Sequence, residues 1–288
     1  MTTPVERCAA ACARRGDPLV GTAPPVGRWL LVEQPGPWGR DALHQSPLPA
    51  PVAASVAAQA AAVRARVLLI RRPGRVVPVA SRRWAFADAD GVRWSSFTDP
   101  EELTDLRLGE LSPGARTPVY LVCTHGKHDR CCAIDGRPLA AALAAVRPTQ
   151  VWECSHVGGD RFAGNLVVLP QGLYYGKVPP ASAAALADRH DAGLLSPEWL
   201  RGQAGLPAAA QAAQHFARAR LAEFRVEALP VLATEQVEHE TWAVTLAGKD
   251  GDLTVTVRGH HHRVDTPLTC AARVPAAVRE FTVVSITG

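Results

Sequence analysis

The sequence lacks any apolar run of the roughly 18 residues that are needed to span a bilayer. The longest candidate, residues 51–63, is short, rich in alanine and interrupted by Ser55 and Gln59. Residues 1–17 also lack the apolar stretch of a secretion signal. We therefore expect a cytoplasmic protein that has no membrane partner.

The sequence also has little excess charge and lacks several familiar catalytic motifs. Its formal net charge is only +4 over 288 residues, so nothing indicates a nucleic-acid partner. It contains no phosphate-binding P-loop, no dinucleotide-binding G-x-G-x-x-G, no G-x-S-x-G elbow and no H-E-x-x-H zinc motif. With 47% hydrophobic and 20% charged residues, the chain is typical of a globular protein that buries a sizeable core.

Seven cysteines are present, which is too few for a disulfide scaffold of this length and more than inert packing needs. In a reducing compartment, clustered cysteines more often bind metals or carry redox chemistry than form structural disulfides. The position of each cysteine therefore decides what it does.

The first half of the chain has the pattern of an α/β unit that ends in a hairpin. Apolar runs and turn signals predict a strand at 29–32, a helix at 52–64, a strand at 67–70 and hairpin strands at 84–87 and 92–95. The charged segment 98–117, punctuated by proline and glycine, is expected to be a linker.

The second half repeats this order. The predicted elements are a strand at 119–123, a helix at 139–146, strands at 151–154, 166–169 and 173–177, and a helix at 181–189. The run WLLVE from Trp29 parallels the run VYLVC from Val119. We interpret the two halves as a duplicated unit of which only the second copy kept its cysteines.

The last part has a different pattern, with a helix from Leu206 to about Phe224 and strands at 242–246, 253–257 and 281–286. The predicted domains are therefore an N-terminal α/β unit at 1–115, a second unit at 116–204, and a C-terminal helix with strands at 205–288.

Four cysteines of the second unit lie around two predicted strand ends. Cys123 ends one strand, Cys131 and Cys132 lie in the predicted loop before the helix, and Cys154 ends the next strand. His156 follows Cys154 almost at once. Because neighbouring loops of an open α/β sheet emerge side by side, these groups are expected to lie close together.

The spacing of these cysteines does not determine which metal or cluster, if any, they bind. The paired knuckles of structural zinc sites are absent, and Cys131-Cys132 is not the C-x-x-C of a dithiol enzyme. Cys123 and Cys132 are far enough apart to wrap an iron–sulfur cluster. A metal, a cluster or a reactive thiol are all compatible with the pattern.

Two segments resemble the sucrase/ferredoxin-like family, whose members are similar to thioredoxin-like [2Fe-2S] ferredoxins. They are CTHGKHDRCC, from Cys123 to Cys132, and CSHVGGDRFAGN, from Cys154 to Asn165. The first-half runs GDPL, from Gly16, and WLLVEQPGPWG, from Trp29, resemble its bacterial members. The resemblance implies an α/β fold: a thioredoxin-like ferredoxin unit preceded by a degenerate copy, with a small C-terminal α+β extension.

The resemblance also implies a ligand set for a [2Fe-2S] cluster. In eukaryotic members two cysteines and an H-x-x-x-H pair hold the cluster, and these positions fall on Cys123, Cys132, His156 and Asp160. Asp160 stands where the second histidine would be, so Cys154 and Cys131 are alternatives for the fourth ligand. An aspartate would make the cluster more negative than a second imidazole would, and so lower its reduction potential.

The remaining cysteines have simpler interpretations. Cys8 and Cys12 are expected in a frayed terminus, Cys270 as a small buried hydrophobe, and Cys131 as a neighbour of the ligand loop without a role. His125 and His128, inside the ligand loop, are expected to be solvated or to act as proton donors near the cluster.

The sequence thus predicts a cytosolic [2Fe-2S] electron-transfer protein that works with an unidentified redox partner protein. The alternatives are a thiol-based redox enzyme that has no cluster and a metal-free or zinc-bound binding module. A glycosidase needs two opposed carboxylates in a sugar-sized cleft, and the sequence indicates no such pair, so an electron carrier is expected rather than a hydrolase.

Overall fold

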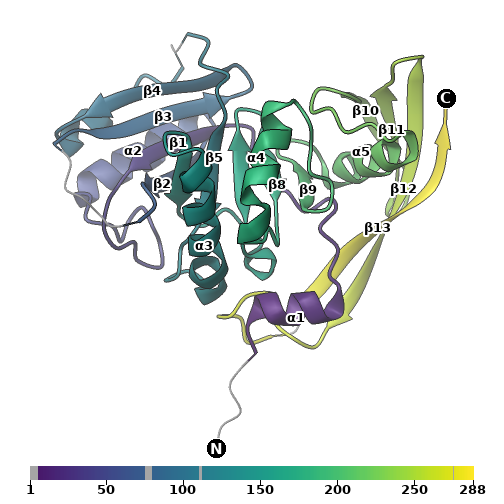
Figure 1. Ribbon diagram of the computed structural model, residues 1–288, viewed down its shortest axis with the longest axis horizontal. Coiled ribbons are helices and arrows are strands. Elements are labelled where there is room, and N and C mark those ends of the chain that lie inside the picture. The colour runs from purple at the N-terminus through teal and green to yellow at the C-terminus, as the bar shows by residue number, and fades with distance from the viewer. Residues whose placement is uncertain (1–5, 75–79, 110–111, 275) are drawn as a thin grey trace, which may run out of the picture.

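The described part of the chain forms two β-sheets, one of nine strands and one of four (Figure 1). The computed structural model describes residues 6–74, 80–109, 112–274 and 276–288. The predicted N-terminal segment and linker therefore lie partly outside the described residues, at residues 1–5 and 110–111. Among the described helices, none has the length and apolar character needed to cross a membrane.

The first half contributes four strands to the large sheet and one covering helix. Its elements are β1 (Trp29–Glu33), α2 (Ala50–Ala62), β2 (Arg66–Arg71), β3 (Arg82–Asp88), β4 (Gly91–Phe97) and the 3₁₀ helix η1 (Pro100–Thr104), with α1 (Cys8–Arg15) before them. β1 pairs in parallel with β2 and antiparallel with β3, which pairs with β4.

The second half contributes five strands. Its elements are β5 (Val119–Cys123), α3 (Arg130–Val146), β6 (Val151–Cys154), η2 (Asp160–Phe162), β7 (Leu166–Leu169), β8 (Leu173–Tyr175), η3 (Pro180–Ser182), α4 (Ala183–Asp191) and β9 (Leu200–Gln203). β5 pairs in parallel with β6 and antiparallel with β7, which pairs with β8.

The pairing order is thus the same in the two halves, and an antiparallel contact between β2 and β6 joins them. The strand order is β4-β3-β1-β2-β6-β5-β7-β8-β9. The expected mixed α/β architecture is confirmed. That the first half descends from a copy of the second stays a prediction, as do the predicted domain boundaries.

Side chains alternate across the large sheet and build separate cores on its two faces. Leu30 and Val32 of β1 pack against α2, whereas Tyr120 and Val122 of β5 pack against α3 and α4. The opposite face of both halves shares one core, and the sheet curls around it. Trp29 in β1 reaches Gly172 beside β8, although four strands separate β1 from β8 in the sheet.

The last part of the chain builds the second sheet against a helix. Its elements are α5 (Ala208–Leu221), β10 (Val231–Glu238), β11 (Thr241–Ala247), β12 (Asp252–Val264) and β13 (Ala276–Thr287). The long β12–β13 ribbon reaches back to lie beside α1 (Figure 1). The connection between β12 and β13 consequently ends up near the start of the chain, although about 260 residues separate them along the sequence.

Several sequence predictions need correction. α3 begins at Arg130 rather than 139, because Asp129 caps it by accepting the Cys131 N–H, and the helix runs through Pro138. Cys131 and Cys132 therefore lie in the first helical turn rather than in a loop. The patterns also missed β9 and β10, and α1 is an ordered helix rather than a frayed terminus.

Candidate metal centre at the start of α3

The loop from β5 to α3 brings Cys123 and Cys132 together. Cys123 is the last residue of β5, and Cys132 lies in the first turn of α3. α3 can pack directly on the end of β5 because Gly136 has no side chain: a Cβ there would lie 2.1 Å from the Cys123 carbonyl oxygen. Both thiols are buried.

The segment after β6 supplies an imidazole and a carboxylate. Arg66 holds this segment by donating hydrogen bonds to the carbonyl oxygens of His156, at 2.6 Å, and of Val157, at 3.0 Å. Gly158 and Gly159 both have positive φ, of 96° and 82°, which turns the chain back toward α3.

Arg201 stabilises the turn at Gly158 and Gly159 through a hydrogen bond. Its guanidinium donates to the carbonyl oxygen of Gly158 at 2.9 Å, and Asn165 donates to that of Gly159 at 2.8 Å. Asp160 therefore begins η2 at a fixed position opposite His156.

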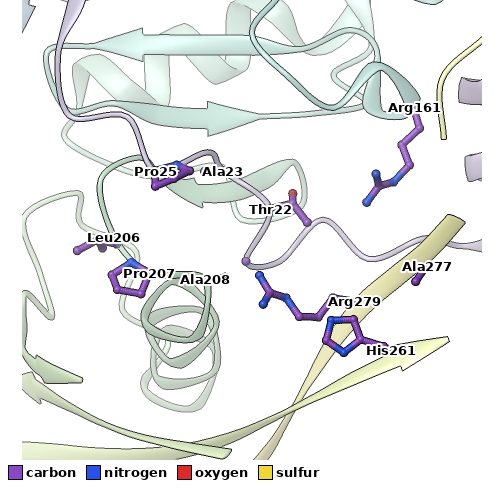
Figure 2. A pocket seen from close by; sticks show the side chains of 11 residues that line it. Thr22, Ala23, Pro25, Arg161, Leu206, Pro207, Ala208, His261, Ala277 and Arg279 are labelled. Atoms are coloured by element: carbon purple, nitrogen blue, oxygen red, sulfur yellow. The ribbon is translucent and has the colours of Figure 1, made fainter. Parts of the chain in front are cut away.

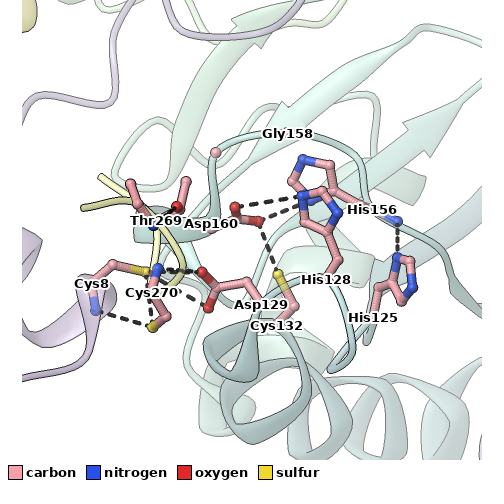
Figure 3. A network of polar contacts seen from close by, with 12 residues as sticks. Cys8, His125, His128, Asp129, Cys132, His156, Gly158, Asp160, Thr269 and Cys270 are labelled. Carbon is pink, nitrogen blue, oxygen red and sulfur yellow. Dashed lines mark hydrogen bonds and ion pairs between the residues drawn. The ribbon is translucent and has the colours of Figure 1, made fainter. Parts of the chain in front are cut away.

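These two segments converge on one buried group of side chains (Figure 3). The Cys132 sulfur lies 3.3 Å from Oδ1 of Asp160, and Nδ1 of His156 lies 2.9 Å from the same oxygen. The donor atoms of Cys123, Cys132 and His156 lie within 4.8 Å of one another. The ring of His128 stacks on that of His156 at a centroid distance of 3.8 Å and points Nε2 toward Asp160.

The charges within this group stabilise one another. Burial would lower the pKa of His156, but Asp160 and Cys123 outweigh it and raise the pKa to about 9. Burial would likewise raise the pKa of Asp160, yet its pairing with His156 holds the pKa below the ordinary value.

The two thiols share their protons unequally. Hydrogen bonding from Cys132, helped by His156, overcomes burial and lowers the pKa of the Cys123 thiol well below its ordinary value. The same contact raises the pKa of Cys132. Together with the N-terminus of α3, the site therefore favours anionic sulfur at Cys123, which is the form that binds metals.

The structure thus gathers all four residues that the resemblance implied, namely Cys123, Cys132, His156 and Asp160. Cys154 pairs in register with Cys123 across β6 and β5 and is fully buried in the core that also includes Cys123 and Cys132, but it belongs to none of the ligand groups among the described residues. Of the three candidates for the fourth position, only the Asp160 carboxylate lies against both Cys132 and His156. Whether these groups coordinate a metal stays a prediction.

His125 is neither solvated nor a member of this group. Its Nδ1 accepts the His156 backbone N–H at 3.3 Å, and its Nε2 lies 2.6 Å from the Gly39 carbonyl oxygen. The tautomer protonated at Nε2 satisfies both contacts. Burial lowers the pKa of His125, so it stays neutral and ties the ligand segments to the first half of the chain.

A second group of sulfurs, which the sequence did not predict, lies on the other side of the α3 N-terminus. Cys8 of α1, Cys131 of α3 and Cys270 of the β12–β13 connection meet beside Asp129. Figure 3 shows Cys8 and Cys270 beside the Asp129 carboxylate. Hydrogen bonding from Cys8 lowers the pKa of Cys131 to about 6 despite burial. No spacing rule would find residues so distant in sequence. Cys12, one turn after Cys8 on α1, belongs to neither group among the described residues.

A pocket of about 570 Å³ lies between α5 and the β12–β13 ribbon (Figure 2). Arg161, His261 and Arg279 provide its basic lining, and none of the four predicted ligands lines it. A smaller pocket of about 410 Å³ adjoins the ligand loop and is lined by His125, Lys127 and other residues.

Two solved structures and one family model match parts of this chain. No curated protein matches the chain significantly. Two matching solved structures are a thioredoxin-like [2Fe-2S] ferredoxin from Aquifex aeolicus and a cysteine-to-serine variant of such a ferredoxin from the same organism. Both are 18% identical; the first covers 32% of this chain and 97% of its own at a TM-score of 0.29, and the second covers 29% and 96% at 0.26.

A family comparison covers much more of the chain. The sequence profile of the sucrase/ferredoxin-like family matches residues 19–202, which include both halves of the large sheet and all four gathered donors. The chain therefore belongs to the sucrase/ferredoxin-like family.

Proposed function

We propose that the chain holds a [2Fe-2S] cluster through Cys123, Cys132, His156 and Asp160 and works as an electron-transfer protein. One observation carries the proposal. Nδ1 of His156 is buried and lies 2.9 Å from Asp160 but is not aligned for a hydrogen bond with it, while the Cys123 and Cys132 thiols converge on the same imidazole. The charge pairing with Asp160 compensates this nitrogen only in part, and a metal bond would satisfy it fully.

The donor set fits such a cluster. Two thiolates and an imidazole are iron–sulfur ligands, and imidazole in place of thiolate raises the potential, as in Rieske centres. The segments that carry the donors follow two adjacent parallel strands, so the sheet fixes their separation. When bound, the cluster would supply one-electron redox chemistry.

The chain's own residues would tune that chemistry. The N-terminus of α3 stabilises negative charge on Cys132, and Asp160 adds a negative charge where a second histidine would add none. The side chain of His156 is 22% exposed, so a proton on its ring can exchange with solvent and couple the potential to pH.

We propose that a redox partner protein approaches over the exposed edges of His128 and His156. Beside this edge, the smaller pocket is lined by Arg71, Lys127 and Arg137. A basic surrounding favours an acidic partner, because complementary charge speeds encounter. The seven free cysteines of the structure fit a reducing compartment, and we place the protein in the cytoplasm.

A thiol-based redox enzyme is the second candidate, and the lowered pKa of Cys123 favours it. The burial of Cys123 argues against a thiol-based enzyme, because this residue is only 1% exposed and a disulfide or peroxide substrate has no path to its sulfur. A metal ligand must be an anionic sulfur but need not be reached by a substrate. A ligand role therefore accounts for both the lowered pKa and the burial of Cys123.

The test is the visible spectrum and the iron and acid-labile sulfide content of protein purified and reconstituted anaerobically. We expect two irons and two sulfides per chain, with ferredoxin-like absorption that is lost in Cys123→Ser and Cys132→Ser. The matched control is Cys12→Ala, which alters a buried cysteine outside the ligand group. Comparing Asp160→Ala with Cys154→Ala identifies the fourth ligand, because only a ligand's loss changes the spectrum and the potential.

Colourless protein without iron after reconstitution would reject the cluster. If one thiol of that protein also reacted fast with iodoacetamide, the thiol enzyme would take its place. Metal without sulfide would instead indicate a single-ion site and a binding module.

We also propose that the first half is a degenerate copy of the second. Support comes from the identical pairing order of β1 to β4 and β5 to β8 around equivalent helices. In β1, Glu33 stands where β5 has Cys123, so the first copy offers no equivalent thiol.

A further inference from the structure

Three cysteines from three distant parts of the chain form a compact triangle of sulfurs. The Cys8 and Cys131 sulfurs are 3.6 Å apart, those of Cys131 and Cys270 are 3.5 Å apart, and those of Cys270 and Cys8 are 3.6 Å apart. None of the three belongs to the group around His156.

A carboxylate lies over this triangle as a fourth donor. The oxygens of Asp129 are 3.6 and 3.8 Å from the Cys8 sulfur. Backbone N–H groups of Cys131 and Cys270 donate to these oxygens at 2.9 and 2.6 Å and so fix the carboxylate in place. Asp129 is 2% exposed, so its charge is sheltered from water.

We propose that Cys8, Cys131, Cys270 and Asp129 form a second metal site, which binds one Zn²⁺. Zinc in structural sites is tetrahedral, with Zn–S bonds of about 2.3 Å, so two thiolates on one ion stand about 3.8 Å apart. With a Zn–O bond of about 2.0 Å, a sulfur and an oxygen stand about 3.5 Å apart. The observed separations match both edges of such a tetrahedron to within about 0.3 Å.

The same distances argue against the other uses of clustered cysteines. A disulfide needs two sulfurs at about 2.05 Å and leaves the third without a partner. In a two-iron cluster only two protein ligands share an iron, whereas three nearly equidistant sulfurs fit one ion. Thiolate-rich sites with one carboxylate suit zinc rather than magnesium or calcium, which prefer oxygen.

The surroundings are suited to the negative charge of three thiolates. Cys8 donates its backbone N–H toward the Cys270 sulfur at 3.5 Å, and Arg130 also contacts that sulfur. Arg7, which pairs with Asp135 at 3.1 Å, adds a cationic group near Cys131 and Cys270. Such groups around a zinc site orient its ligands and offset their charge.

The position of the site indicates a structural role. The apolar cluster around these sulfurs is small, with only Cys8, Cys131 and Ala163 buried in it. Zinc would tie α1 and the β12–β13 connection to the start of α3, the helix that also presents Cys132. Closing such long loops stabilises the folded state. This inference does not depend on the proposed iron–sulfur cluster.

The experiment measures zinc by mass spectrometry in protein produced with zinc and passed over a desalting column. We expect one zinc per chain, a tenfold or greater loss in Cys8→Ser and in Cys270→Ser, and no loss in Cys12→Ala, which alters a buried cysteine of the same helix. In Cys132→Ser, which removes a thiol of the other group, zinc should stay while the iron-dependent colour is lost.

A second measurement separates ligand loss from misfolding. Cobalt added to metal-free Cys132→Ser protein should give the intense visible bands of tetrahedral thiolate coordination, and these should be absent when Cys270→Ser is combined with it. Circular dichroism checks that each variant folds. Full zinc content in folded Cys8→Ser and Cys270→Ser, or a disulfide among these three cysteines in anaerobically purified protein, would overturn the proposal.

Discussion

Replacing Gly136 with alanine tests how the fold positions the candidate metal centre. The added Cβ would lie 2.1 Å from the Cys123 carbonyl oxygen, which is backbone and cannot rotate away. α3 would have to retreat from β5 by roughly 1 Å to restore an ordinary contact. Cys132 lies one turn before Gly136 on the same face of the helix, so its sulfur would move away from Cys123.

Two effects of opposite sign determine how much Gly136→Ala changes the free energy of unfolding. Alanine is favoured over glycine in a helix by about 1 kcal/mol. Overpacking against a rigid neighbour costs about 1–3 kcal/mol, and a clash this close with backbone belongs at the upper end. We therefore expect Gly136→Ala to lose about 2 kcal/mol of unfolding free energy, which is a Tm lower by about 4–8 °C for a chain of this size.

Urea denaturation and thermal melts measure the loss, and iron content measures the displacement of Cys132. The control is Gly27→Ala, because a Cβ at Gly27 meets no atom within 4 Å and its φ is not positive. We expect that control to lie within about 0.5 kcal/mol of the parent protein. If Gly136→Ala were instead more stable by about 1 kcal/mol, helix propensity alone would govern the position and the close-packing argument would fail.

Three further predictions concern buried charges. Burial would raise the pKa of Asp17, but the ion pair with Arg15 holds this pKa below the ordinary value. The pair therefore stabilises the folded state fully above about pH 4, and its contribution is lost as the pH falls through the lowered pKa of the folded state. Asp17→Asn should therefore cost about 3 kcal/mol at pH 7 in urea unfolding, and a gap that did not shrink in acid would contradict the assignment. Asp160→His, which replaces an anionic ligand with a neutral one, should raise the potential by about 100 mV or more in a spectroelectrochemical titration, and an unchanged potential would show that residue 160 is not a ligand. Arg201→Met should cost about 3 kcal/mol, because it leaves the buried oxygens that Arg201 now contacts without a donor; an equally stable variant would mean that these oxygens find other donors.

The strands were largely predictable because their signal is local. The four apolar residues before Cys123, and the run from Val151 to Cys154 in which only Glu153 is charged, predict β5 and β6 with the bounds that the structure has. The start of α3 was not predictable from the apolar pattern, because the contact of Asp129 with the Cys131 N–H sets its first turn and the helix continues through Pro138. Edge strands such as β9 are weakly marked because their pairing depends on a distant partner.

The sequence alone determined the residue types of the candidate centre and the strands that carry them, because a motif and its spacing are properties of the chain. It could not decide which of Asp160, Cys154 and Cys131 faces Cys132, since the path of α3 and the turn at Gly158 set those directions. Nor could it bring Cys8, Cys131 and Cys270 together, because their meeting depends on the ribbon of β12 and β13 returning to α1. Local patterns fix elements, whereas contacts between residues more than a hundred positions apart arise only when the elements pack.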